Sequence, residues 1–111
     1  MTLRDVVKAL DLEVAAGKDL MDRVVNGGYA SDVLSDVLTN SGQGYLWITV
    51  QVHPNVSAVA TAKGLAAVII ANGRDPEDET LRKAEKKKVP ILKSRWSTYK
   101  VAGMLYELGI E

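Results

Sequence analysis

Hydrophobic positions along this chain fall into blocks that predict strands and helices in turn. The clearest block, Tyr45 to Gly73, predicts a strand, a helix and a second strand. Residues 45–52 are rich in aromatic and β-branched side chains, which suit an extended backbone, and residues 65–71 are apolar throughout, as expected of a central parallel strand. Pro54 suits the first turn of the intervening helix, and Gly64 suits its left-handed end. Because such a unit makes a right-handed crossover, both strands should end at the same edge of the sheet.

The flanking segments continue this alternation of strands and helices. Further helices are expected after Thr2, after the N-cap candidates Ser31 and Asp32, from Asp75 to about Lys88, and from Thr98 to Leu108. Further strands are expected over Leu12 to Ala15, Val24 to Tyr29 and Val89 to Leu92. The pattern predicts a single α/β layered domain, residues 1–111, with a mainly parallel central sheet flanked by helices.

The composition limits the classes of protein to consider. With 111 residues, 47% of them hydrophobic and 25% charged, the chain is expected to form one globular domain. The 14 basic residues balance the 14 acidic ones, so neither nucleic acid nor a membrane surface is expected as a partner. No apolar run reaches the roughly 20 residues of a membrane span, and the first ten residues lack the apolar stretch of a signal peptide. We therefore expect a cytoplasmic location.

The chain has few residues that could bind a metal ion or a cofactor. Cysteine is absent and His53 is the only histidine, so neither a disulfide nor a histidine-based metal site within one chain is expected. Gly27-Gly28 resembles a phosphate loop only loosely, and nothing matches the full nucleotide-binding loops. The basic run at residues 83–88 contains Glu85 and no aromatic residue, which is typical of a solvated helix face. We expect no metal, no cofactor and neither ATPase nor kinase activity.

Polar residues gather where the central strands are expected to end. His53 and Asn55 follow the first strand, and Asn72, Gly73 and Arg74 follow the second. Open α/β sheets bind ligands beyond the carboxyl ends of their strands, and a helix N-terminus beside an arginine suits an anion. The predicted small-ligand site comprises Gly28, Ser31, His53, Asn55, Asn72, Gly73 and Arg74.

A second interpretation of these residues is purely structural. Asn72-Gly73 is a common turn dipeptide, and Asp75 is a good cap that would itself occupy the following helix N-terminus. A general-base role for His53 would require an orienting partner, for which Asn55 and Asp75 are the candidates. A turn with a neutral loop histidine therefore stands as the alternative to a ligand site.

The last predicted helix carries two apolar stripes. The first has the i, i+3, i+4, i+7 spacing of a core face and comprises Val101, Met104, Leu105 and Leu108. The second comprises Tyr99, Ala102, Gly103 and Tyr106. One small core needs only the first stripe, so the second is expected to form a homodimer interface, with Trp47 extending the patch. The competing explanation is that this helix is buried between the sheet and another helix of its own chain.

The order and spacing of these elements resemble the DRTGG domain family over nearly the whole chain. The family's Asp-Arg motif falls on Val52-His53, and its Thr-Gly-Gly motif falls on Ala71-Asn72-Gly73. Only Gly73 is retained, so the resemblance rests on strand pattern and spacing. It implies one DRTGG-like domain, similar in fold to the N-terminal domain of HPr kinase/phosphorylase and, more distantly, of the Mur ligases. DRTGG domains accompany other modules as regulatory or dimerising parts.

The residues and the resemblance together predict a non-catalytic regulatory or interaction domain. The expected protein is a homodimer that senses a small anionic or nucleotide-like ligand and acts on a regulated protein partner. The alternative is a small enzyme or phosphate-transfer accessory protein that uses His53 and Arg74.

Overall fold

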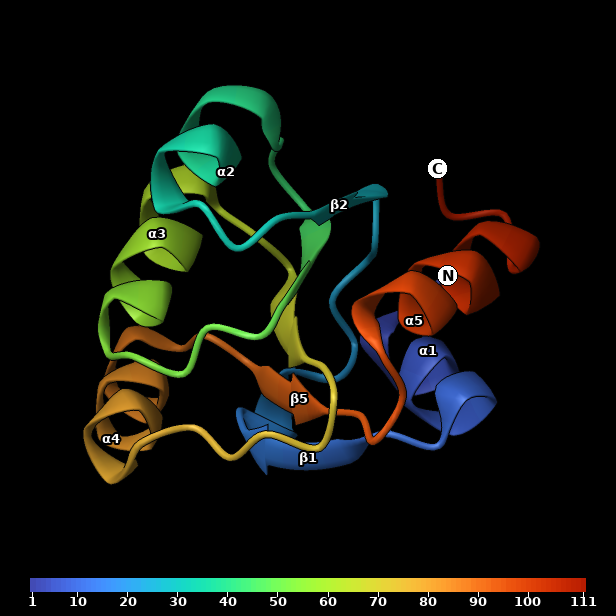
Figure 1. Ribbon diagram of the computed structural model, residues 1–111. Helices are drawn as coiled ribbons and strands as arrows, with labels where there is room; N and C mark the ends of the chain where they lie inside the picture. The colour runs from blue at the N-terminus through green and yellow to red at the C-terminus, as the bar shows by residue number, and fades with distance from the viewer.

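The computed structural model describes residues 1–111, and strands alternate with helices along almost the whole chain (Figure 1). In chain order the elements are α1 (Leu3–Leu10), β1 (Glu13–Ala16), the 3-10 turn η1 (Lys18–Leu20), β2 (Gly27–Ala30), α2 (Leu34–Asn40), β3 (Tyr45–Thr49), α3 (Asn55–Lys63), β4 (Ala67–Ile70), α4 (Asp78–Lys87), β5 (Ile91–Lys93) and α5 (Thr98–Glu107). None of the helices combines the length and apolar character that a membrane crossing requires.

The strands form one sheet in the order β1-β5-β4-β3-β2. Strands β2, β3, β4 and β5 are parallel, and β1 joins β5 in the antiparallel sense at one side of the sheet. The predicted α/β fold and its mainly parallel sheet are confirmed, including the strand–helix–strand unit β3–α3–β4. The parallel strands all end at one edge, formed by residues 31–32, 50–53, 71–75 and 94–97, which we call the C-terminal edge. The loops leaving β3 and β4 cross the near side of the sheet in Figure 1.

Helices cover both faces of the sheet unequally. We call the face under α2, α3 and α4 the three-helix face, and the face under α1 and α5 the two-helix face (Figure 1). Leu46 and Ile48 point into the core of the two-helix face, and Trp47 points into the core of the three-helix face. Successive side chains of a strand point to opposite faces of the sheet, so this alternation follows from the extended backbone of β3.

Several helix ends follow the capping signals in the sequence. Thr2 and Asp5 form a complete capping box at the start of α1, and the Ser97 hydroxyl accepts the Lys100 backbone N–H at 3.2 Å at the start of α5. Gly64 ends α3 in the left-handed region with φ of 62°, where a side chain would be strained. Local sequence therefore determines these ends directly.

Two predicted helix starts are wrong. Helix α2 begins at Leu34 after Val33, whose side chain cannot cap it. Ser31 and Asp32 are not the cap, because the Ser31 hydroxyl accepts the Val33 N–H and the Asp32 carboxylate accepts the Val50 N–H. Helix α4 begins at Asp78 after Glu77, so Asp75 does not cap it. The Asp75 carboxylate instead pairs with the Lys93 ammonium across the C-terminal edge. In both cases a tertiary partner displaces a local cap.

Candidate functional site

The loop after β4 has a fixed shape at the C-terminal edge. Asn72 and Gly73 have φ of 64° and 68°, which these two residue types tolerate best. The Asn72 backbone N–H donates to the Trp96 carbonyl oxygen at 2.7 Å, and the Gly73 N–H donates to the Ser94 carbonyl oxygen at 2.8 Å. The predicted Asn-Gly turn is present, and it fastens the loop after β4 to the loop after β5.

Arg74 joins this loop to the next strand end. Its Nη1 donates to the Val50 carbonyl oxygen at 2.7 Å, across the ends of β4 and β3. The sequence-based expectation that these two strand ends lie together is therefore met. An exposed guanidinium that uses one N–H internally retains other donors for a ligand.

Asp32 has a structural role that the sequence did not indicate. Its Oδ1 accepts the Thr49 hydroxyl and the Val50 backbone N–H, both at 2.9 Å. The Gln51 side-chain amide donates to the Asp32 carbonyl oxygen, also at 2.9 Å. The neighbouring Ser31 hydroxyl accepts the Val33 N–H at 3.1 Å. These bonds hold the start of α2 against the end of β3.

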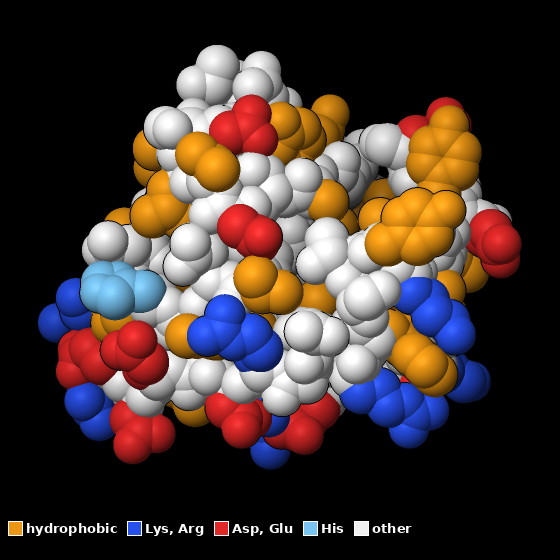
Figure 2. Space-filling model, in the orientation of Figure 1, with side chains coloured by type: hydrophobic (Ala, Val, Ile, Leu, Met, Phe, Trp, Pro, Cys, Tyr) orange, Lys and Arg blue, Asp and Glu red, His pale blue; other side chains and the backbone are white.

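His53 lies at the surface, and its ring has a local partner. Nδ1 accepts the Asn55 backbone N–H at 3.1 Å, so the ring closes the first turn of α3. The single histidine is the pale-blue group in Figure 2, and the hydrogen bonds of the structure include no carboxylate that orients it. No group of three or more potential metal-ligating side chains is arranged to hold an ion. The geometry assigns His53 a capping contact.

Gly28 differs from the other predicted site residues. It lies within β2, paired in register with Leu46, and a Cβ atom placed on it would meet Ile110 at 3.7 Å. Gly28 therefore faces the end of the chain rather than the C-terminal edge. The structure brings Asn72, Gly73 and Arg74 together and places Ser31 further along the same edge.

A hollow of about 250 Å³ opens at this edge beside Gly73. Its lining residues are Asp11, Glu13, Gly73, Lys93, Ser94, Arg95 and Trp96. Sequence analysis found only Gly73 among them. The missed signal was that residues 94–96 follow β5 just as residues 72–74 follow β4, and ends of parallel strands share an edge.

The cations around this hollow differ in how they are balanced. Lys93 pairs with Asp75 and, at 3.7 Å, with Glu13. The hydrogen bond that the Lys93 ammonium donates to Asp75, together with the negative charges of Asp75 and Glu13, raises the pKa of Lys93. Arg95 and Lys100 have no acidic partner within ion-pair distance, and instead lie over the Trp96 ring. Positive charge is therefore unbalanced on the Trp96 side.

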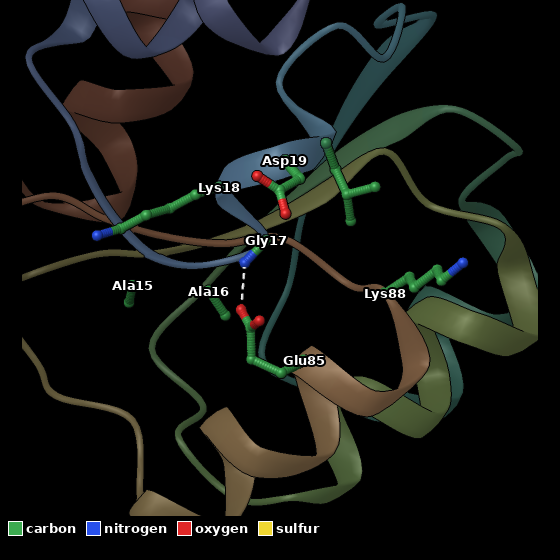
Figure 3. A pocket seen from close by; sticks show the side chains of 8 residues that line it. Ala15, Ala16, Gly17, Lys18, Asp19, Glu85 and Lys88 are labelled. Carbon is green, nitrogen blue, oxygen red and sulfur yellow. Dashed lines mark hydrogen bonds between the residues drawn. The ribbon is translucent and has the colours of Figure 1, made fainter.

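A larger hollow, about 690 Å³, lies at the opposite edge between η1 and α4 (Figure 3). Glu85 Oε1 accepts the Gly17 N–H there at 2.5 Å, and the side chains of Lys18 and Lys88 extend in opposite directions. Charged groups that diverge cannot hold one small ligand together. The larger hollow is therefore a weaker candidate for a ligand site than the hollow at the C-terminal edge.

Helix α5 exposes the second stripe that its sequence predicted. Tyr99 is 90% exposed and Tyr106 is 64% exposed, and a Cβ atom added to Gly103 would meet nothing within 4 Å. Hydrophobic side chains stand out over α5 in Figure 2, and Ala102 beside them is half-buried. The expectation that Trp47 extends this patch is wrong. That side chain is fully buried on the three-helix face, where its Nε1 donates to the Ser31 carbonyl oxygen at 2.8 Å.

Comparison with known proteins identifies the family. The DRTGG domain matches residues 5–108. The chain belongs to the DRTGG domain family. The resemblance inferred from strand order and spacing is thereby confirmed.

The fold of this DRTGG domain also occurs in a solved structure. The crystal structure of the CBS and DRTGG domains of the regulatory region of Clostridium perfringens pyrophosphatase, complexed with the activator diadenosine tetraphosphate, superposes with a TM-score of 0.72. The match covers 94% of this chain at 11% sequence identity, and this chain spans 45% of the other. At that identity the likeness shows the fold alone. No curated protein matches the sequence significantly.

Proposed function

We propose that this DRTGG domain is a non-catalytic regulatory or interaction domain. It senses a small anionic or nucleotide-like ligand at the C-terminal edge and forms a homodimer through α5. The observation that carries the ligand proposal is the hollow beside Gly73, where the loops after β4 and β5 are fastened together and Arg95 lines the space without an acidic partner. The Clostridium perfringens regulatory region, which shares the fold, was crystallised with a nucleotide activator, and this supports the ligand class.

The contacts of His53 and Arg74 favour sensing over catalysis. Nδ1 of His53 accepts a backbone N–H of its own helix, and Nη1 of Arg74 donates to a backbone carbonyl oxygen. A general base needs a partner that orients its ring and a free nitrogen facing substrate. The enzyme alternative would require His53 to leave its capping contact, whereas ligand binding by the loops requires no such change.

The dimer proposal is supported by the exposed surface of α5. Tyrosine can bury its ring against a partner while its hydroxyl stays hydrated, and Gly103 permits a close approach between two helices. A C2 pair would bury the same patch on both copies. Tyr99, Gly103 and Tyr106 would then form the centre of that contact.

A ligand screen tests the sensing function. Nucleotides and phosphorylated metabolites are added to the wild-type protein in a thermal-shift assay, where a ligand at 100 times its Kd should add about 2.7 kcal/mol of stability. Amide chemical-shift mapping of any hit should then show the largest changes at Gly73, Ser94 and Trp96. Changes centred on residues 86–88 of α4 would overturn the location, and a screen without any binder would overturn sensing itself.

A further inference from the structure

Trp96 is held in one position at the mouth of the hollow. Its backbone N–H donates to the Ser94 hydroxyl at 3.1 Å, and its carbonyl oxygen accepts the Asn72 N–H at 2.7 Å. The half-buried indole packs against the core of the two-helix face. A ring fixed in this way gives a rigid platform for whatever lies over it.

Two cationic side chains occupy that platform. The Lys100 ammonium lies 3.7 Å from the ring centroid, and the Arg95 guanidinium carbon lies 4.7 Å from it. Cation–π attraction restrains long side chains that are otherwise mobile. Arg95, in the loop before α5, lines the hollow itself, and Lys100, in the first turn of α5, reaches the hollow's edge through its contact with the Trp96 ring.

The positions of the acidic side chains near this platform indicate on which side of the hollow an anion would bind. Glu13 and Asp75 are engaged by Lys93, which leaves Asp11 as the lining acid without an ion-pair partner. An anion would avoid Asp11 and approach the Trp96 side, where Arg95 and Lys100 are unpaired. The charge pattern around the hollow is thus directional.

We propose that Arg95 and Lys100, positioned by Trp96, form a phosphate-binding subsite at this edge. This inference rests on the proposed ligand-sensing function and specifies its chemistry. The arginine fork can donate two parallel hydrogen bonds to a phosphate, and the lysine adds a point charge. The recognised group is the phosphate itself, which a nucleotide or an inorganic polyphosphate can supply.

Calorimetric titration with three probes tests the subsite and identifies the source of the phosphate. Pyrophosphate and ADP should both bind the wild-type protein, with an affinity that falls as salt is raised, and adenosine should bind far more weakly. Comparable affinities for pyrophosphate and ADP would mean that phosphate alone suffices, and tighter ADP binding would indicate a nucleotide. Adenosine binding as tight as that of ADP would overturn the subsite.

Charge-removing variants locate the phosphate. Arg95→Gln and Lys100→Gln should each weaken pyrophosphate binding about tenfold or more, as expected for hydrogen bonds to a charged group. Asp11→Asn should strengthen it, and Lys83→Gln, an exposed lysine on α4, is the matched control that should leave it unchanged. Binding should also change the fluorescence of Trp96, since a phosphate beside Arg95 and Lys100 changes the charge next to its ring, while the emission of the buried Trp47 should not change.

The outcomes separate this inference from the broader function. If a ligand from the screen binds at the edge but the double variant Arg95→Gln/Lys100→Gln keeps wild-type affinity for it, the subsite is wrong and ligand sensing stands. If no compound of any class binds the folded wild-type protein, both fail. Circular dichroism of each variant confirms that folding is retained.

Discussion

On the three-helix face of the sheet, α2, α3 and α4 close over Trp47, the largest of the fully buried side chains. On the two-helix face, α1 and α5 cover the same strands, and the outer side of α5 leaves Tyr99 and Tyr106 in solvent. Both faces still bury a complete row of sheet residues, such as Val68 on one and Ile69 on the other. Both faces therefore have well-buried cores, and they differ in the aromatic side chains that the outer side of α5 leaves exposed.

This contrast shows that whether an aromatic side chain is buried depends on the element that carries it. A strand in a parallel sheet has helices on both faces, so every position of β3 meets a packed layer. A surface helix has one covered side, and an aromatic residue on its other side is left for solvent or a partner. From the sequence, Tyr106 was assigned to the interface and Trp47 to an extension of it, but only Tyr106 lies on an element with an uncovered side.

The largest expected effect comes from removing the buried aromatic side chain. Trp47→Ala should destabilise the fold by about 3–5 kcal/mol, because it leaves a cavity on the three-helix face. It also removes the bond from Nε1 to the Ser31 carbonyl oxygen. Tyr99→Ala should change the free energy of unfolding by less than about 0.5 kcal/mol, as is usual for an exposed position. Urea denaturation of both variants makes the comparison, and equal losses would contradict it.

The next prediction concerns association rather than folding. Tyr106→Glu should abolish the proposed homodimer, because an unpaired charge placed in a dry contact costs several kcal/mol. The monomer should stay folded, since Tyr106 is 64% exposed in one chain, but its unfolding midpoint should no longer rise with protein concentration as that of the dimer does. Sedimentation at several concentrations measures the state of assembly.

A matched substitution on the other face controls for added charge. Leu38 on α2 is 42% exposed, so Leu38→Glu adds the same charge to an exposed apolar position on the outer side of the three-helix layer. It should leave the dimer intact. A wild-type protein that is monomeric at high concentration, or a Leu38→Glu variant that dissociates as readily as Tyr106→Glu, would rule out the α5 interface.

The sequence was a good guide wherever short-range rules decide the outcome. The β3–α3–β4 crossover, the capping box at Thr2 and the end of α3 at Gly64 follow from residue types that act within a few positions of themselves. The roles of Asp32 and Asp75 did not follow, because each local cap competes with a partner about 18 residues away, such as Val50 for Asp32.

The site could be predicted in part for the same reason. Asn72, Gly73 and Arg74 were found because they follow a strand that the sequence marks clearly. Trp96 and Arg95 were missed because β5 is only three residues long and its position between β1 and β4 depends on the whole strand order. The position of β5 beside β4 is set by the order of the strands in the sheet and not by neighbouring residues in the sequence, and the lining of the hollow depends on it.

A smaller effect should come from the polar anchor of α2, the helix of the three-helix face with one buried residue, Val37. Asp32→Ala removes the acceptor for the Thr49 hydroxyl and the Val50 N–H, and should cost about 1–2 kcal/mol because Asp32 is itself exposed. Asp22→Ala is the control, since its ion pair with Arg4 is fully at the surface and should cost less than about 1 kcal/mol. Urea denaturation gives both values, and the same loss in both variants would show that Asp32 is no anchor.

The smallest expected effect is a pH dependence of stability at Asp36 of α2, whose carboxylate accepts the Tyr29 hydroxyl. The Ser31 side chain, the Tyr29 hydroxyl and the Asn40 amide lower the pKa of the Asp36 carboxyl, and the hydrogen bond to Asp36 raises the pKa of Tyr29. Because the pKa of Asp36 is lowered on folding, its contribution to stability is present above the ordinary aspartate pKa of about 3.9 and is lost as the pH falls through the folded value. The contribution of Tyr29 has the opposite sign: it is present below about pH 10 and is lost as the pH rises through the raised pKa.

Asp36→Asn should therefore lower the urea midpoint most between about pH 5 and 9, and the difference from wild type should shrink below about pH 4 as Asp36 is protonated. Asp19→Asn controls for the loss of one negative charge on an exposed residue. Carboxyl chemical shifts followed by NMR should show Asp36 titrating below the ordinary range. A midpoint difference that stays constant from pH 3 to 8 would mean that the Tyr29–Asp36 bond at 2.8 Å adds nothing through its charge, and that α2 is held by Val37 and Asp32 alone.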